Sequence, residues 1–543
     1  MSLKNFSSDG GEVSEKHSDV TKLPIEDKTE DYLLKHERKR LSQGLKQRHI
    51  QMLTLVGVIG TGLFLSSGGT LAKTGPCGIL LCYLFIGIII SMNQLCIAET
   101  SCMLPATGST IRQAEHFMDE AIGFSYGWIS VYSAFLPTEL AAAAVVVSYW
   151  TPLSPAIWIS IMAIVEVATN SYSVRFYGEV EFCFGLLKIS LVFGLIICGL
   201  VIDLGGVPGQ DRIGFRYWDN PGPFAEYIVT GNVGKFCGFW SAINSVVYAY
   251  AGLQGVATLA GETEYPRRSI FRAAKRVMFR ICFLYCLSVF ILGLLVPYND
   301  SDIATSTGTA SSSPFVIAIK RAGIPALPSI INAVVLTSAF SSGNLGLVTA
   351  SRTLFALAVK KQAPKILLRT NKRGVPYVAL GVSACFLPLA YMSCSDSADT
   401  VFSWFQNITS SNTLLNWILI SVNHIAMSKA MKVQGYSRDD LPHKAKFTEA
   451  YSYISLFFSV IFLLTAGYEN FMHGDFDFSS FFTDYFIIPL FFILYFFWKI
   501  LKKTKFLKPS EVDLASLFKD VRENPEPPYK KLKGWEVLTA LWA

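Results

Sequence analysis

Long apolar stretches recur along most of this chain, and short polar or basic segments separate them. Each stretch has roughly 20 residues, which is the length an α-helix needs to cross the hydrocarbon core of a bilayer. The pattern therefore predicts an all-α membrane protein with twelve transmembrane helices. The expected spans are 51–71, 79–102, 123–149, 155–172, 182–204, 236–258, 276–297, 326–349, 376–394, 400–424, 451–472 and 479–500.

Polar segments flank these spans at both ends of the chain. Residues 1–50 are rich in Ser, Asp, Glu and Lys, so they bury too little apolar surface to fold alone, and they lack the apolar core of a cleavable signal peptide. We expect a disordered cytosolic tail at 1–50, a twelve-helix transporter domain at 51–500 and a cytosolic tail at 501–543.

The distribution of Lys and Arg predicts the orientation of the chain. The loops after the sixth, eighth and tenth spans carry many basic residues, whereas residues 394–399 and 473–478 carry no Lys or Arg. Because basic residues are more frequent in short loops on the cytosolic side, we expect the basic loops and both termini in the cytosol.

The composition agrees with a membrane protein and argues against several other classes. Of 543 residues, 51% are hydrophobic and 16% are charged, whereas soluble domains have roughly 25% charged residues. The net charge of +7 comes from scattered loops, which argues against nucleic-acid binding. The 11 cysteines form no CxxC pair, so we expect no disulfide framework, no metal site and no cofactor.

Two of the predicted spans contain glycine-rich interruptions. The first span holds Gly57-Val-Ile-Gly-Thr-Gly62, and the sixth holds Tyr248-Ala-Tyr-Ala-Gly-Leu-Gln-Gly255. Each of these spans opens a set of five helices, as expected for two inverted five-helix repeats followed by two extra C-terminal helices. Freed N–H groups at one break can bind a carboxylate and freed carbonyls at the other can bind an ammonium group, which suits an α-amino acid. Alternatively, these glycines only allow close helix packing.

Four ionisable residues lie inside the predicted spans. They are Lys188 in the fifth, Glu139 in the third, Glu99 at the end of the second and Glu166 in the fourth. An ionisable side chain in the bilayer costs at least about 2.5–3.5 kcal/mol unless it is paired or hydrated, so the first three are candidates for proton coupling or gating. The alternative is that Lys188 extends to the cytosolic surface and Glu99 meets an interfacial base. We expect Glu166 to be structural.

A dense set of short motifs runs from about Leu45 to Lys503. Among them are Val58-Ile-Gly-Thr-Gly-Leu-Phe64, Leu104-Pro-Ala-Thr-Gly-Ser109 and Ser437-Arg-Asp-Asp-Leu-Pro442. Together these motifs resemble those of the fungal amino acid permeases of the amino acid, polyamine and organocation superfamily. The resemblance implies a twelve-helix carrier of the inverted-repeat fold, usually in the plasma membrane, that uses a proton gradient to import amino acids.

The same resemblance assigns roles to individual residues. Lys188 matches a lysine that, in proton-coupled relatives, stands where sodium sits in sodium-coupled ones. Tyr248 matches the aromatic residue that closes over the substrate. The implied substrate-binding residues are Ile59, Gly60, Thr61 and Gly62 for the carboxylate, Tyr248, Ala249, Tyr250, Ala251 and Gly252 for the amino group, and Ser403, Asn407 and Thr409 for side-chain specificity.

Three further stretches bear on the substrate. Leu200–Gly206, together with the outer loop that follows it, looks most like the dicarboxylic branch, which takes glutamate and aspartate. Most members have Glu where this chain has Gln254, and losing that fixed charge would ease entry of a second carboxylate and shift proton transfer to Lys188 or Glu139. The polar run Ser410-Ser-Asn-Thr413 suits either a polar substrate side chain or a helix contact satisfied by hydroxyl groups.

These features predict a proton-coupled permease that prefers acidic L-amino acids. A general or neutral amino acid permease is the alternative within the family, and a non-transporting amino acid sensor is an alternative from another class. No span contains a motif such as HExxH with a ligand set, so we do not expect an enzyme. Expected partners are an amino acid substrate, protons and membrane lipid. Lysines that could recruit ubiquitin ligase machinery, or simply carry solvated charge, are Lys4, Lys16, Lys22 and Lys28.

Overall fold

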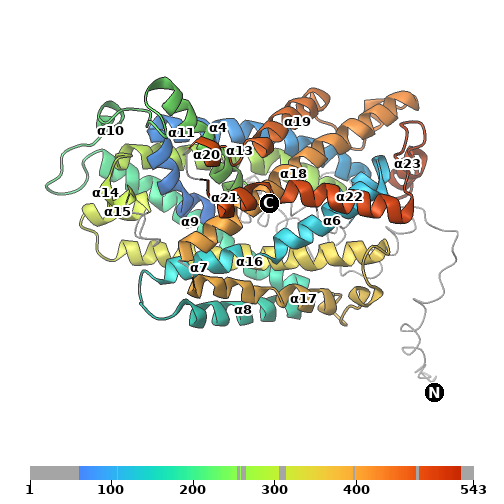
Figure 1. The fold of residues 1–543 in the computed structure, drawn as a ribbon, viewed down its shortest axis with the longest axis horizontal. Helices are drawn as coiled ribbons and strands as arrows, with labels where there is room; N and C mark the ends of the chain where they lie inside the picture. The colour runs from blue at the N-terminus through green and yellow to red at the C-terminus, as the bar shows by residue number, and fades with distance from the viewer. Residues whose placement is uncertain are drawn as a thin grey trace, which may run out of the picture.

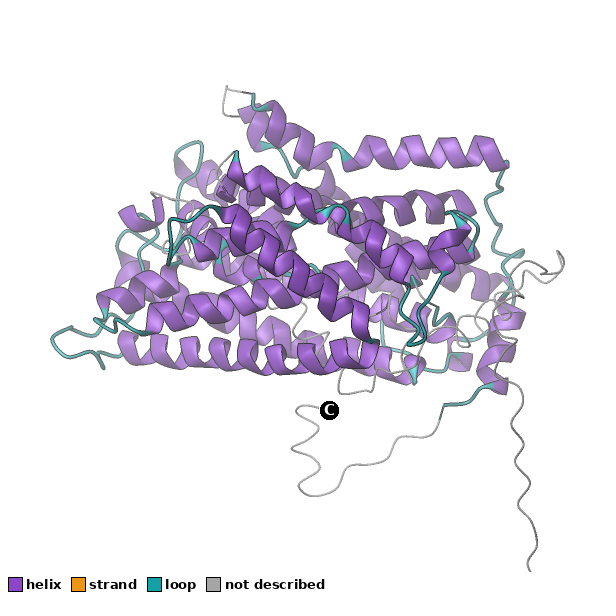
Figure 2. Ribbon diagram, turned by 90° about the horizontal axis from the view of Figure 1, so that it is seen from below, coloured by secondary structure: helices purple, strands orange, loops and turns teal. Residues whose placement is uncertain are grey.

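The structure of the protein is a computed structural model that describes residues 60–526, apart from 107, 253–256, 258–264, 305–312, 396–397 and 473–475. The side chains of 174 and 275–279 are also left undescribed. The expected tail at 1–50 therefore lies outside the described residues, as do Ile59 and Gln254. Within the described part every regular element is a helix, and the long helices pack side by side with their axes roughly aligned (Figures 1 and 2).

Helices occupy the ranges that the apolar pattern predicts, although several of the expected spans form in two pieces. The elements before residue 300 are α3 (Thr61–Phe64), α4 (Ser66–Met103), α5 (Ser109–Phe117), α6 (Glu120–Phe135), α7 (Thr138–Val147), α8 (Pro155–Tyr172), α9 (Val174–Asp203), α10 (Arg216–Asp219), α11 (Gly231–Ala249) and α13 (Pro266–Leu295). Those after it are α14 (Ser301–Ala304), α15 (Pro314–Arg321), α16 (Leu327–Val359), η4 (Lys365–Leu368), α17 (Tyr377–Ala384), η5 (Leu387–Cys394), α18 (Ala398–Val433), η6 (Arg438–Asp440), α19 (Thr448–Leu464), α20 (Glu469–Met472), α21 (Phe478–Tyr485), α22 (Ile487–Lys502) and α23 (Leu514–Glu523).

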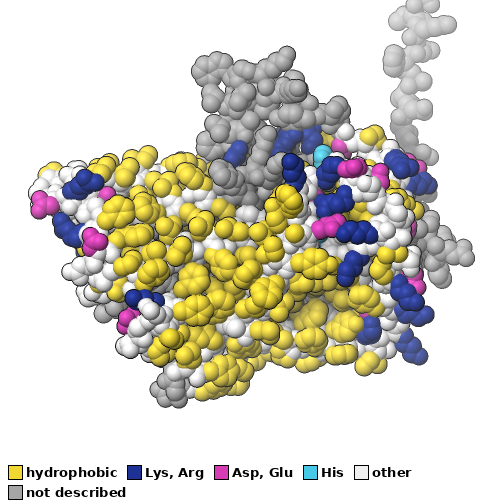
Figure 3. Space-filling model, turned by 90° about the horizontal axis from the view of Figure 1, so that it is seen from above, with side chains coloured by type: hydrophobic (Ala, Val, Ile, Leu, Met, Phe, Trp, Pro, Cys, Tyr) yellow, Lys and Arg dark blue, Asp and Glu magenta, His cyan; other side chains and the backbone are white. Residues whose placement is uncertain are grey.

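The length and hydropathy of these helices fit a membrane. Five helical stretches of the described chain are long and apolar enough to cross a bilayer, and α21 with α22, bent by 46°, is a sixth candidate. On α8 the side chains of Ile157, Ile161 and Ile164 follow one helical face and remain exposed, as expected for a surface that contacts lipid. Figure 3 shows a broad apolar belt, with Lys and Arg gathered mainly at one end. The protein is thus an integral membrane protein.

Backbone breaks divide the long helices at positions that the residue types explain. At Gly75 the backbone has φ +74°, and a Cβ atom there would lie 2.7 Å from the Ala225 nitrogen, so this turn in α4 requires glycine. Between α6 and α7 the chain breaks at Leu136 and Pro137. Proline has no N–H to donate and its ring crowds the preceding turn, which ends a helix. The two glycine-rich interruptions were predicted from the sequence, whereas the break at Leu136 and Pro137 was not.

The last described helix, α23, packs against the helical body. Its buried residues Leu514, Leu517 and Phe518 join a hydrophobic cluster with Phe117 and Met427. Asp520 on the same helix forms a buried ion pair with the guanidinium of Arg267, at the start of α13. Part of the segment expected to form the cytosolic tail at 501–543 is therefore packed on the helical body.

We predict that Asp520→Ala weakens this attachment. The substitution leaves the Arg267 charge buried without its carboxylate, and breaking a buried pair in this way costs roughly 3–5 kcal/mol. Limited proteolysis of the purified protein should therefore cut the chain near α23 faster than in the wild type. The double variant Arg267→Met with Asp520→Leu removes both charges and should restore much of the protection. Equal cleavage rates in the wild type and Asp520→Ala would show that the ion pair does not hold the helix.

Candidate functional site

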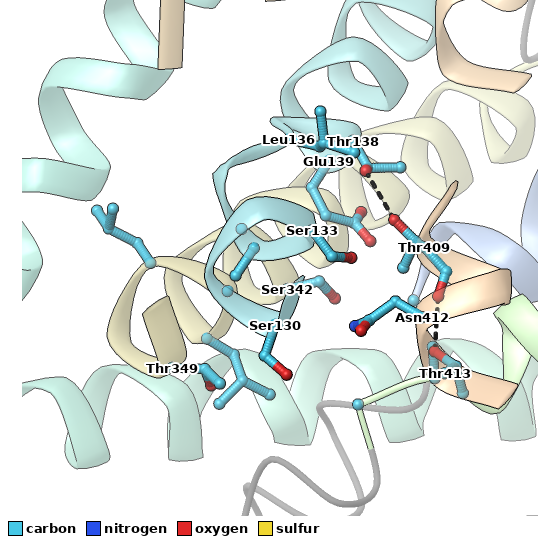
Figure 4. Close-up of a pocket in the computed structure, with 18 of the residues that line it drawn as sticks. Ser130, Ser133, Leu136, Thr138, Glu139, Ser342, Thr349, Thr409, Asn412 and Thr413 are labelled. Atoms are coloured by element: carbon cyan, nitrogen blue, oxygen red, sulfur yellow. Dashed lines mark hydrogen bonds between the residues drawn. The ribbon is translucent and has the colours of Figure 1, made fainter. Parts of the chain in front are cut away.

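A cavity of about 260 Å³ lies where the broken helices meet. Its walls come from the start of α3, the break between α6 and α7, the end of α11, and the facing sides of α16 and α18. Figure 4 shows side chains from these elements converging on one space. Of the residues implied by the family resemblance, those that line it are Gly60, Thr61, Gly62, Tyr248, Ala249, Ala251, Gly252 and Thr409. Glu139, which was predicted as an ionisable residue inside the third span, lines it too.

The two glycine-rich breaks come together at this cavity. Gly60 is extended and α3 begins directly after it, so the first N–H groups of that helix lack acceptors within the helix. At Gly62 a Cβ atom would lie 2.8 Å from the Cα of Ala249, so only glycine permits this approach between α3 and α11. Gly252 has φ +91°, which lets the chain turn after α11 ends. The cavity is therefore bordered by exposed main chain from both breaks.

Glu139 links three of the cavity walls. Its Oε2 accepts a hydrogen bond from the Thr61 hydroxyl at 3.0 Å, and its Oε1 accepts one from the Tyr248 hydroxyl at 3.1 Å. The Thr61 and Tyr248 hydroxyl oxygens are themselves 3.2 Å apart. Since these residues lie on α3, α7 and α11, one carboxylate joins both glycine-rich breaks to the unpredicted break at Pro137.

The aromatic ring of Tyr248 also closes one side of the cavity. It packs against Phe402 with ring centroids 5.9 Å apart in an edge-to-face arrangement. Both rings belong to a hydrophobic cluster that includes Ala142 and Val401. Tyr248 thus contributes a hydroxyl group to the polar centre and an apolar ring to the wall, as a closing aromatic residue requires.

Behind the cavity, buried ionisable groups form a second layer. Lys188 is fully buried and its Nζ donates to the Ser342 hydroxyl, a cavity-lining group, at 3.4 Å. The charge of Lys188 interacts with the carboxylates of Glu139 and Glu181. Glu181 is buried too and accepts a hydrogen bond from the Ser341 hydroxyl. Sequence reasoning missed Glu181 because it lies one residue before the expected fifth span, where it counted as a loop residue.

Glu166, which we expected to be structural, lies in the wall of the cavity. It is buried, lines the cavity and faces the backbone of α16, where a Cβ atom at Gly343 would lie 2.2 Å from its Oε1. Gly343 therefore leaves room for this carboxylate. The hydropathy pattern could not show this contact, because it depends on how α8 packs against α16.

Three of the residues implied by the family resemblance lie away from the cavity. Tyr250 follows the end of α11 and points into the core, where its hydroxyl donates to the Tyr83 carbonyl at 3.1 Å. Asn407 faces α11, and its Oδ1 accepts from the Asn244 amide at 3.3 Å. Ser403 is exposed on α18 and lines no part of the cavity.

Glu99 also lies away from the cavity, in a buried cluster of its own. Its carboxylate is 2.9 Å from His424 Nε2, and it accepts hydrogen bonds from Arg438 Nη2 at 2.8 Å and from the Ala445 N–H at 2.7 Å. The interfacial base considered from the sequence is thus present as Arg438. This cluster ties α4 to α18 and to η6, so its immediate role is to hold these elements together.

Comparison with known proteins assigns this chain to a family. The sequence model of the amino acid permease family matches residues 49–511. The dicarboxylic amino acid permease of Saccharomyces cerevisiae is 37% identical over 502 residues, which cover 91% of this chain and 82% of that protein. The proline-specific permease of Emericella nidulans is 39% identical over 488 residues, with 88% of each chain covered.

A further relative has a different printed specificity, and a solved structure shares the fold. The lysine-specific permease of Saccharomyces cerevisiae is 35% identical over 556 residues, which cover 98% of this chain and 90% of that protein. A crystal structure of a manganese transporter from Eremococcus coleocola shares the fold with a TM-score of 0.54 at 12% identity, over 90% of this chain and 98% of that one. From the family match and these identities, the chain belongs to the amino acid permease family, whose members are transporters rather than enzymes.

Proposed function

We propose that this protein imports L-amino acids across the plasma membrane by proton symport. The observation that carries the proposal is the single carboxylate of Glu139, which joins α3, α7 and α11 at a cavity bordered by main chain from two helix breaks. A substrate at this place would touch the elements that have to move when the cavity opens to one side or the other.

The main chain supplies groups suited to the head of an amino acid. The N–H groups at the start of α3, from Thr61 onward, would hold the carboxylate, because helix N-termini carry partial positive charge and free donors. The carbonyl groups near the end of α11, around Ala249 and Ala251, would accept from the ammonium group. Backbone recognition of this kind reads the parts shared by all L-amino acids and leaves side-chain selection to other walls.

Proton coupling is assigned to Glu139, with Lys188 and Glu181 behind it. As a carboxylate, Glu139 accepts from both Thr61 and Tyr248. Once protonated, it becomes a donor at one oxygen and cannot accept in the same way. Binding a proton therefore changes the link between the two breaks. Lys188, near enough to interact with both carboxylates, would respond to that change in charge.

The membrane arrangement that we propose keeps the twelve spans, the inverted five-helix repeats, the tails at 1–50 and 501–543 and the cytosolic termini expected from the sequence. The break before α3 and the end of α11 at Ala249 support this arrangement, because such repeats contain discontinuous helices. The basic loops then face the cytosol. Ubiquitin ligase machinery acting on tail lysines remains part of the same proposal.

For the substrate class, the sequence favours acidic L-amino acids, with a general or neutral permease as the second candidate. The likeness to a dicarboxylic amino acid permease supports the first. The second is supported by the cavity, since none of its described lining residues is Lys, Arg or His. A side-chain carboxylate would thus lack a basic partner there, which is costly in a buried site.

Uptake by intact cells tests the function. Labelled glutamate, leucine and lysine would be offered to permease-deficient yeast expressing the chain, at pH 5 and pH 7, with and without a protonophore. We expect uptake that is faster at pH 5 and stops with the protonophore. Surface-localised protein that takes up no amino acid would instead support a sensor.

Gly62→Ala tests the close contact between the two breaks. The added methyl group meets the main chain of Ala249 at 2.8 Å, and overpacking of this kind costs roughly 1–3 kcal/mol. We expect amino acid uptake to fall by about tenfold or more while the protein stays in the membrane. Gly69→Ala is the matched control, because nothing lies within 4 Å of its added carbon. If both variants transport like the wild type, the interrupted-helix site is wrong.

Lys188→Met tests the coupling layer. Methionine has a similar length without the charge, so substrate exchange across the membrane should persist while the dependence of uptake on external pH is lost. Lys519→Met, at an exposed position on α23, is the control and should keep the wild-type pH profile. A steep pH profile retained in Lys188→Met would remove this lysine from proton coupling.

A further inference from the structure

One face of α18 presents a row of hydrogen-bonding side chains to the cavity. Thr409, Asn412, Thr413 and Asn416 all line it. Their spacing of three and four residues places them on the same side of a helix, over a length of roughly 10 Å. Figure 4 shows Asn412 reaching into the cavity between Thr409 and Thr413. The row therefore offers one continuous polar surface to whatever fills the space.

The threonines in this row already have partners within the protein. The Thr413 hydroxyl donates to the Thr409 carbonyl at 2.8 Å, and the Thr409 and Thr138 hydroxyl oxygens are 3.4 Å apart. By contrast, the buried Oδ1 atoms of Asn412 and Asn416 have no hydrogen-bond partner among the described residues. The unused hydrogen-bonding capacity of the row thus belongs to the two asparagines.

The neighbouring polar residues of α18 serve a different purpose. Ser410 donates to the Asn244 carbonyl at 3.0 Å, and Ser411 donates to the Asp484 carbonyl at 2.8 Å. These two serines join α18 to α11 and α21. Of the polar run from 410 to 413, the first half is therefore a helix contact and the second half lines the cavity. Buried amide groups in a membrane helix that bind no neighbour are costly unless a ligand or water pairs with them.

Charge restricts what the row can recognise. The ionisable carboxyl groups among the described lining residues are Glu139 and Glu166, and no Lys, Arg or His side chain lines the cavity with them. Lys188 lies behind the wall, with its Nζ on Ser342. A substrate side chain that carried a full negative charge would share the cavity with two carboxyl groups and no basic lining residue, whereas a neutral polar group would meet no such repulsion and could pair with the amides and hydroxyls.

We infer that Asn412 and Asn416 form the side-chain subsite of the transporter, and that it takes an uncharged planar group with a carbonyl oxygen beside a donor. Such a group is a side-chain carboxamide or a protonated side-chain carboxyl. Each asparagine amide can accept from the donor and donate to the carbonyl of this group. The inference rests on the proposed function and names the substrate class of the same cavity.

The test measures uptake of labelled glutamine, glutamate, leucine and alanine by cells expressing the full chain. In Asn412→Ala and Asn416→Ala we expect glutamine uptake relative to leucine to fall roughly 10- to 100-fold, because the polar contact is lost and apolar space is gained. Alanine, whose methyl group does not reach these residues, should enter within about twofold of the wild-type rate. Asn423→Ala is the matched control on the same helix, since its amide binds the Thr110 carbonyl and lines no part of the cavity.

Two further arms distinguish the carboxamide from the protonated carboxyl. For the wild type, glutamine uptake with little glutamate uptake assigns the subsite to carboxamides. Glutamate uptake that rises more steeply than glutamine uptake between pH 7 and pH 5 assigns it to the protonated carboxyl as well. Asn412→Asp keeps the size of the side chain, so it avoids a cavity. A carboxylate can accept from the donor of the substrate group but cannot donate to its carbonyl, so uptake of glutamine and of protonated glutamate should fall together.

Other outcomes overturn the inference. It is wrong if the glutamine-to-leucine ratio is unchanged in both alanine variants while alanine uptake is normal. It is also wrong if glutamate is taken up well and its uptake rises no more steeply than glutamine uptake between pH 7 and pH 5, since the side chain would then enter as a carboxylate. Absence of uptake for all four amino acids by surface-localised wild type would instead overturn the proposed function itself.

Discussion

The hydrogen bonds of Glu139 are the interaction on which the rest of the site depends. Thr61 and Tyr248 lie at the helix ends beside the two glycine-rich breaks, and the carboxylate of Glu139 accepts a hydrogen bond from each of them. A carboxylate inside a membrane protein is costly alone, but here two hydroxyl donors and the nearby Lys188 charge compensate it. The same contacts set the distance between α3 and α11, and so they shape the cavity that the substrate would fill.

Much of the fold could be predicted from the sequence, because a bilayer requires long apolar helices and leaves a strong pattern. The break after Gly60 and the turn at Gly252 were likewise visible, since glycine clusters inside apolar spans are unusual. Pro137 was an available signal for the third break, but the surrounding run of apolar residues masked it. Proline inside a span ends or kinks a helix there, so this residue could have identified the break beside Glu139.

The side-chain set was harder to predict, because it depends on the direction in which each residue points. Tyr250 and Tyr248 are two residues apart at a helix end, yet one faces the core and the other the cavity. Asn407 and Asn412 lie on one helix and face different neighbours for the same reason. The family resemblance indicated which positions to consider, but it did not show which way each side chain points from its helix. Glu181 needed packing information, since its partner Ser341 is 160 residues away in the chain.

The polar face of α18 has a consequence for how the chain is assembled in the membrane. For a helix that carries Asn412 and Asn416, insertion into lipid by itself has an unfavourable free energy, because unpaired amides are costly there. The other helices that line the cavity are α3, α5, α6, α7, α8, α11, α16 and η5, all of which precede α18 in the chain. They are therefore synthesised before α18 leaves the ribosome. Among the helices that line the cavity, α18 is therefore the last to be inserted. Its polar face can then pack directly against the other walls instead of against lipid.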